Sequence, residues 1–122
     1  MKHTKIKWLD CPQKHDYPAA QSYLQLSMEP RAAKKLIEKL RHAKLTHFAA
    51  KDVFRASGLS LLGVSDSHVQ EKRTQIIEAQ ALSPILLHRN RRNGRLIIAD
   101  GYHRLCAVYT FDEDAMVPCR IV

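Results

Sequence analysis

The stretch "RLIIADGYHRLCAVY", from Arg95 to Tyr109, decides the fold that this sequence predicts. The run Arg95–Ala99 is typical of a buried strand, and the residues from about Gly101 to Thr110 have the spacing of a helix. A strand that enters a helix through glycine leaves backbone N–H groups unpaired at the start of the helix. Together with the positive end of the helix dipole, these donors predict an anion site at the Asp-Gly-Tyr-His-Arg turn.

The side chains of this turn indicate which anion it would bind. Gly101 has no Cβ to keep a phosphate away from the backbone, His103 is a second donor, and Arg104 offers a forked, permanently charged pair of donors. Asp100 does not suit a bare phosphate, because a carboxylate repels it. It either caps the helix or helps to hold Mg²⁺ that bridges phosphate oxygens. The alternative for the whole turn is a well-capped helix whose histidine and arginine are exposed.

The flanking segments predict an α+β domain with a small mixed sheet. Asn93-Gly94 is a strong hairpin signal, and it joins the strands Ile85–His88 and Arg95–Ala99. "MVPCRIV" predicts a final strand. Upstream, we expect a short strand over Ala49–Phe54 and a helix from Ser67 to about Gln80, which Ser67 and Gln70 open as a capping box. Helices and strands in this order, with one hairpin, are typical of a compact α+β fold.

The first 45 residues are predicted to be helical. One helix has Pro18 as its first residue and Asp16 as its cap, and a second begins near Pro30. The apolar stripe of the second helix consists of Ala33, Leu36, Ile37 and Leu40. Its opposite face is basic, with Arg31, Lys34, Lys35, Lys39 and Arg41. We therefore expect a single domain, 1–122, in which a helical N-terminal extension (1–48) packs on an α+β core (49–122).

Composition limits the setting and the partners. The 122-residue chain carries 20 Lys and Arg against 12 Asp and Glu, a formal net charge of +8. Such a surface attracts polyanions such as nucleic acid, although simple solvation or one phosphate pocket explains it equally well. Three scattered cysteines predict no disulfide framework and fit a reducing, cytoplasmic setting. The sequence shows no signal peptide and no stretch long enough to span a membrane.

The segment "IIADGYHRLCAV" resembles the phosphate-binding turn of the ParB/sulfiredoxin superfamily, where a strand meets a helix at a Gly-x-x-Arg motif. The order of elements over Ala49–Val122 is similar as well. Sulfiredoxins have Gly-Cys-His-Arg, and Tyr102 stands at the cysteine position, where a phenol cannot replace the thiolate. Partition ParB proteins have Gly-Glu-Arg-Arg, bind CTP and continue into a helix-turn-helix domain, which does not follow here. Neither activity is therefore expected.

The motif of the free-serine kinases, Asp-Gly-His-His-Arg, is the most similar to Asp100–Arg104. This resemblance implies a nucleotide (ATP, ADP or CTP), with Mg²⁺ at Asp100. It implies catalytic roles for Asp100, His103 and Arg104, and a ligand contact from Gly101. Tyr102 shares a helical face with Leu105, Cys106 and Tyr109, so we expect it to pack in the core or to stack on the base of the ligand. Those kinases also use a glutamate base, for which Asp52 and Glu71 are candidates by position only. The expectation is a small phosphotransferase or nucleotide hydrolase, or a domain that binds a nucleotide without turning it over.

Further residues are expected near the ligand, each with a plainer alternative. In the superfamily, basic residues from the first core strand contact the phosphates, which implies that Lys51 and Arg55 do so here. The alternative is that both residues lie on a strand edge exposed to solvent. His68 lies in the first turn of its helix and could face the same ligand, or be an ordinary surface histidine. A second functional hypothesis is a non-catalytic nucleic-acid-binding or regulatory module that uses the basic helix and four hairpin arginines, Arg89, Arg91, Arg92 and Arg95.

Overall fold

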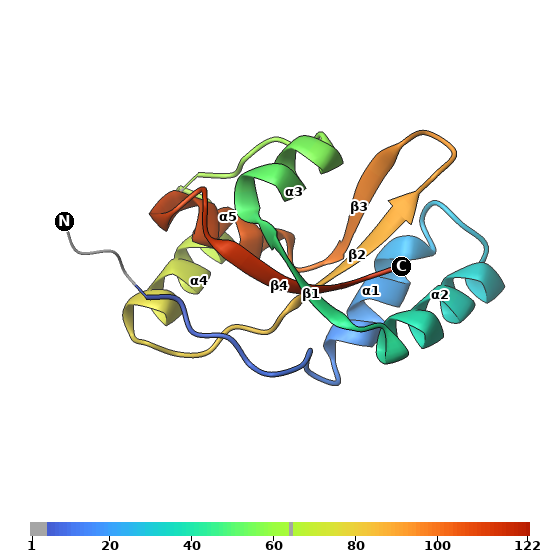
Figure 1. The fold of residues 1–122 in the computed structure, drawn as a ribbon, viewed down its shortest axis with the longest axis horizontal. Coiled ribbons are helices and arrows are strands. Elements are labelled where there is room, and N and C mark those ends of the chain that lie inside the picture. The colour runs from blue at the N-terminus through green and yellow to red at the C-terminus, as the bar shows by residue number, and fades with distance from the viewer. Residues whose placement is uncertain (1–4, 64) are drawn as a thin grey trace.

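The computed structural model describes residues 5–63 and 65–122, which form five helices and a four-stranded mixed sheet (Figure 1). The predicted α+β class is confirmed. The helices are α1 (Asp16–Leu24), α2 (Pro30–His42), α3 (Ala50–Ser57), α4 (Ser67–Ile77) and α5 (Tyr102–Phe111). The strands are β1 (Leu45–Ala49), β2 (Ile85–Asn90), β3 (Arg95–Asp100) and β4 (Met116–Ile121).

The strands lie in the order β1-β4-β2-β3. The predicted hairpin is confirmed: β2 pairs antiparallel with β3, and Gly94 at the end of the turn has φ +67°. The predicted final strand is also confirmed as β4, which pairs antiparallel with β1 and parallel with β2. Because β3 ends at Asp100 and α5 begins at Tyr102, the Asp-Gly-Tyr-His-Arg turn joins the edge strand of the sheet to a helix that packs on it.

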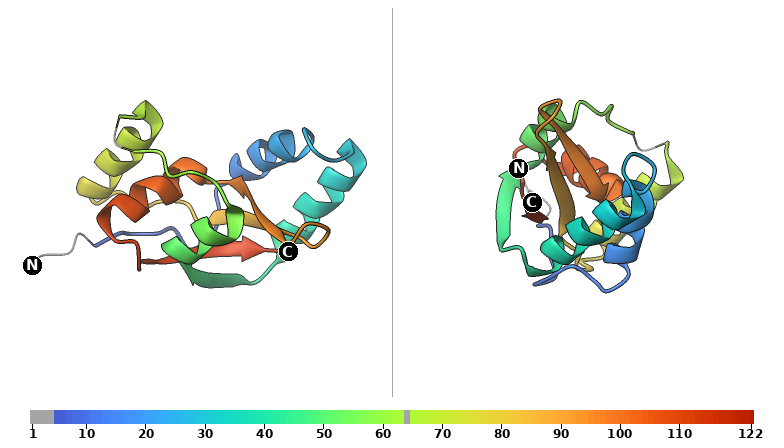
Figure 2. Two further views of the ribbon diagram at one scale, coloured as in Figure 1. Left: turned by 90° about the horizontal axis from the view of Figure 1, so that it is seen from above. Right: turned by 90° about the vertical axis from the view of Figure 1, so that its right-hand side faces the viewer.

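Helices cover both faces of the sheet. Side chains alternate between the faces along a strand, so Ile85 and Leu87 of β2 pack with α3, α4 and α5, whereas Leu86 between them packs with α1 and α2. Among the described residues, the polar side chains that are buried are those of Asp16, Ser57 and Ser83. Helices α1 and α2 lie together at the end of the molecule opposite to α4 (Figures 1 and 2). No helix in the described ranges has the length and apolar character needed to cross a membrane.

The N-terminal helices form as predicted, except that Asp16 lies inside α1 and does not cap it. Helix α2 begins at Pro30 as predicted, and Ala33, Ile37 and Leu40 of its apolar stripe are buried. Helix α1 begins at Asp16 and not at Pro18, so Asp16 is not its cap. The Asp16 side chain is buried and accepts hydrogen bonds from the Gln13 N–H and the Ser83 hydroxyl.

The strand predicted over Ala49–Phe54 is wrong. The strand is β1, four residues earlier, and Ala50–Ser57 forms α3. The buried residues of α3 are spaced i, i+3, i+4, i+7, which is the period of a helix that packs on one side: they are Ala50, Val53, Phe54 and Ser57. Residues 45–48, expected in the helical extension, therefore belong to the sheet.

Helix α4 begins at Ser67 but is not opened by the predicted capping box. Its cap is Asp66, whose Oδ1 accepts hydrogen bonds from the N–H groups of His68 (2.9 Å) and Val69 (3.1 Å). The helix ends at Ile77, three residues before the predicted end. Ala79 then has φ +60°, a left-handed conformation that stops the helix.

Candidate functional site

The head of α5 has the form predicted from the sequence. Gly101 is its N-cap in the left-handed region, at φ +107°, and its carbonyl accepts the hydrogen bond from the N–H of Leu105 (2.9 Å). No side chain in residues 5–63 and 65–122 caps the helix. The N–H groups of the first turn, at Tyr102, His103 and Arg104, are therefore available to an external acceptor.

Gly101 is required by packing inside the protein, whereas the sequence predicted that it makes room for a phosphate. A Cβ at this position would overlap Cγ2 of Ile85 and lie 2.9 Å from Nη2 of Arg104. The space beside Gly101 is thus filled by β2 and by the Arg104 side chain. The glycine is explained by this contact and by its φ, without an approaching phosphate.

Arg104 lies against two carboxyl groups. Its Nη2 donates to Oδ2 of Asp100 at 2.9 Å, and its Nη1 lies 3.7 Å from Oδ1 of Asp16. Nη2 also lies 3.4 Å from the carbonyl oxygen of Pro84, and only 11% of the Arg104 side chain is exposed. The guanidinium expected on the phosphate is therefore used inside the protein, and Asp100 binds it in place of capping α5.

Asp16 completes this cluster, a role that differs from the helix cap predicted for it from the sequence. The residue is 1% exposed, and its interactions extend from the N-terminal helix to the segment before β2 through Ser83. On the solvent side, Nε2 of His15 lies 3.4 Å from Oδ1 of Asp16. Burial raises the pKa of the Asp100 carboxyl, Arg104 opposes this shift, and the nearby Asp16 adds to it. Two carboxyl groups, that of buried Asp16 and that of half-buried Asp100, thus share one guanidinium.

Two histidines meet at the outer side of the α5 head. His68 in the first turn of α4 and His103 in the first turn of α5 have ring centroids 5.0 Å apart. His68 is exposed and His103 is half-buried. The structure therefore brings together two of the predicted ligand contacts that lie 35 positions apart in the sequence. Hydrogen bonds from the N–H groups of Val69 and His68, together with both imidazoles, lower the pKa of Asp66.

Tyr102 belongs to the packing around this pair. Its ring lies 5.5 Å from that of His103, and its hydroxyl donates to the carbonyl of Ser60. The half-buried ring also packs against the core formed with α3, α4 and α5. Burial raises the pKa of the phenol. Tyr102 therefore holds the 58–63 loop beside the α5 head.

Lys51 and Arg55 do not join the other predicted contacts. Both lie on α3, and Nζ of Lys51 pairs at 2.5 Å with Oδ1 of Asp114, beyond the far end of α5. Arg55 is 82% exposed and lies 3.8 Å from Asp52, one of the two candidate bases. The other candidate, Glu71, is an exposed residue of α4. The geometry assigns a general base to neither.

Asp100 does not fit the Mg²⁺ role that the resemblance implies. Its Oδ2 is held by Arg104, and a cation placed there would lie beside a guanidinium. Within the described ranges, no three His, Cys, Asp or Glu side chains converge on a metal position. What the α5 head offers is a set of N–H donors with two imidazoles beside them, which is the chemistry of an anion site.

Comparison of the chain with protein-family models, with curated proteins and with solved structures found no match. Function is therefore inferred from the geometry of the site.

Proposed function

We propose that this chain is a nucleotide-binding α+β domain whose phosphate site is the head of α5. The observation that carries the proposal is the pairing of His68 and His103, with ring centroids 5.0 Å apart, beside a helix start without a side-chain cap. Backbone N–H groups and the helix dipole favour an anion there, and the two imidazoles add side-chain donors. A terminal phosphate is an anion that can accept several such hydrogen bonds at once.

In this proposal Arg104 and Asp100 act as positioning residues. Their pairing fixes the turn between β3 and α5, and Asp16 holds Arg104 from the other side. Since two carboxylates lie against the guanidinium, its net attraction for a phosphate outside the cluster is small. His103 follows Gly101 by two residues, so its direction depends on the geometry of this turn.

The resemblance to the ParB/sulfiredoxin superfamily supports a phosphate at this position, because the Gly-x-x-Arg motif begins where β3 meets α5, as that family implies. It is also the reason for naming ATP, ADP and CTP as the nucleotides to test. No chemical step is assigned to Mg²⁺, because Asp100 does not fit it. The proposal is binding, without turnover.

A thermal-shift experiment with ATP, ADP and CTP, each with and without Mg²⁺, tests the proposal. A ligand that binds only the folded state, at one hundred times its Kd, stabilises the protein by about 2.7 kcal/mol. We expect stabilisation by at least one nucleotide and its loss in His68→Ala and in His103→Ala. The matched control is His42→Ala, because His42 is an exposed residue of α2. Stabilisation by none of the nucleotides, or equal losses in all three variants, would overturn the proposal.

A second candidate function is nucleic-acid binding by α2. It is favoured by the exposure of the basic face of α2, which comprises Arg31, Lys34, Lys35, Lys39 and Arg41. Only Arg41 of this set has a carboxylate partner among the described residues, Glu38 at 3.5 Å. Such binding should weaken steeply with salt and in Lys35→Glu, because it depends on releasing counterions from phosphates. Nucleotide binding at α5 should be unaffected by Lys35→Glu.

A further inference from the structure

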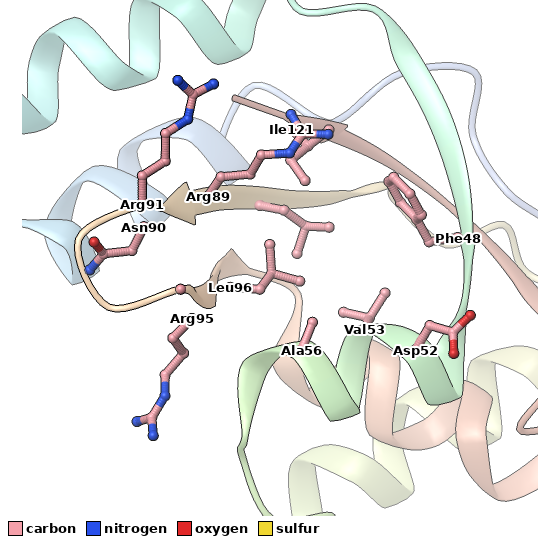
Figure 3. Close-up of a pocket in the computed structure, with 12 residues that line it drawn as sticks. Phe48, Asp52, Val53, Ala56, Arg89, Asn90, Arg91, Arg95, Leu96 and Ile121 are labelled. Atoms are coloured by element: carbon pink, nitrogen blue, oxygen red, sulfur yellow. The ribbon is translucent and has the colours of Figure 1, made fainter.

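An open groove lies between α3 and the β2–β3 hairpin (Figure 3). Its volume is about 410 Å³, within the range of small-molecule sites. The groove floor is apolar and is formed by Phe48, Val53, Ala56, Leu87, Leu96 and Ile121. None of these residues belongs to the α5 head, so this hairpin groove is separate from the proposed phosphate site.

Charge is distributed unevenly around the hairpin groove. Three arginines of the hairpin, Arg89, Arg91 and Arg95, line it on one side, and Asp52 of α3 lines it on the other. Figure 3 shows the Arg89 side chain extending along the groove toward Ile121, whereas Arg91 and Arg95 point away on either side of the hairpin tip. In the part of the chain that the structure describes, none of the three arginines forms an ion pair with a carboxylate.

This combination suits one class of ligand. An apolar floor gains free energy when it covers a hydrocarbon body, since water leaves both surfaces. A guanidinium without a partner at one end of that floor favours a carboxylate or a phosphate, which it can bind with two parallel hydrogen bonds. A neutral hydrocarbon would leave the arginines unused, and a highly charged polyanion would leave the floor exposed.

We propose that the hairpin groove binds a small amphiphilic anion, with its hydrocarbon body on the floor and its acidic head on Arg89. Asp52 on the opposite rim sets the orientation, because it repels the head from the α3 side. Two sources share this chemistry: a free alkyl carboxylate and an alkyl phosphate. Both heads fit the guanidinium, and an experiment distinguishes them.

The test is a titration of the full chain with decanoate and, separately, with decyl phosphate, below the concentration at which either forms micelles. Binding is followed by two-dimensional NMR, with the methyl signals of Val53, Leu87 and Leu96 as reporters. We expect these signals to move on saturation, and the Kd values to show which head is preferred. Butyrate, which has the acidic head with little hydrocarbon, should bind far more weakly.

Two variants and a matched control locate the site. Arg89→Gln should weaken binding about tenfold, and Ala56→Phe should abolish it by filling the groove from an exposed position on α3. Arg92→Gln is the control, because Arg92 lies in the turn of the same hairpin but does not line the groove. Equal losses in Arg89→Gln and Arg92→Gln would overturn the proposal, since they would show unspecific charge attraction. Absence of shifts with both probes would overturn it too, as would shifts confined to His68 and His103.

Discussion

The buried carboxyl of Asp16 provides the sharpest test of how the α5 turn is held. We expect Asp16→Asn to destabilise the protein measurably although the change is isosteric. The substitution keeps an acceptor for the Gln13 N–H and the Ser83 hydroxyl, but it removes the charge 3.7 Å from Nη1 of Arg104. Removing one partner of a buried ion pair costs about 3–5 kcal/mol when the other charge is left alone. Arg104 still has Asp100 at 2.9 Å, so the expected cost is smaller, about 2 kcal/mol.

This free energy is large enough to measure by two methods. In a chain of this length, about 2 kcal/mol lowers the Tm by about 8 °C. In urea, the midpoint should fall while the slope m stays constant, because the same surface is exposed on unfolding. The matched control is Asp10→Asn, an exposed carboxylate on the same N-terminal segment, which should change stability by less than about 0.5 kcal/mol. Equal stability of Asp16→Asn and Asp10→Asn would show that the charge of Asp16 does not hold Arg104 in place.

Three further outcomes follow from the same structure. Gly101→Ala should lower the free energy of unfolding by about 3 kcal/mol or more, because residue 101 has a positive φ and the new Cβ would overlap Ile85. Gly63→Ala is the control: a Cβ there has no atom within 4 Å, so urea titration should show almost no change in stability. Folding raises the pKa of the Asp100 carboxyl, so this group contributes stability below about pH 3.9 that is lost as the pH rises through its pKa in the folded state. The free energy of unfolding of the wild type, relative to that of Asp100→Asn, should therefore fall between pH 3.5 and pH 7. A rise would show that Arg104 lowers the pKa of Asp100 by more than burial raises it. Burial raises the pKa of Cys119 to about 12, so a thiol reagent followed by peptide mass spectrometry should label exposed Cys11 in the native protein and Cys119 only in denaturant.

The elements that could be predicted from the sequence have local signals. The hairpin depends on Asn93-Gly94, α2 on its apolar stripe after Pro30, and α5 on the strand-to-helix change at Gly101. Each of these signals lies within one or two turns of chain, and each prediction is confirmed. The prediction of a strand over Ala49–Phe54 was wrong because a short run of alanine, valine and phenylalanine fits the two-residue period of a strand as well as the 3.6-residue period of a helix. In the folded protein, tertiary packing of α3 on the sheet decides between them.

The candidate site was predictable only in part, for the same reason. His103 and Arg104 were identified from the turn itself, and His68 from its place in a helix start. Of the two carboxyl groups that hold Arg104, Asp100 lies only four positions before it, but Asp16 lies 88 positions away, and no local pattern reports that contact. The guanidinium was therefore expected to face outward, although it lies inside the protein against two carboxyl groups, with 11% of the side chain exposed.

The position of β4 has a consequence for how the protein is made. This strand follows the other three in the sequence, yet it lies between β1 and β2 and joins them. A ribosome must therefore synthesise the chain through residue 121 before the sheet can close, and until then the facing edges of β1 and β2 have no partner. Nascent chains stalled at residue 112 should accordingly be protease-sensitive and recruit holdase chaperones, whereas the released protein should do neither.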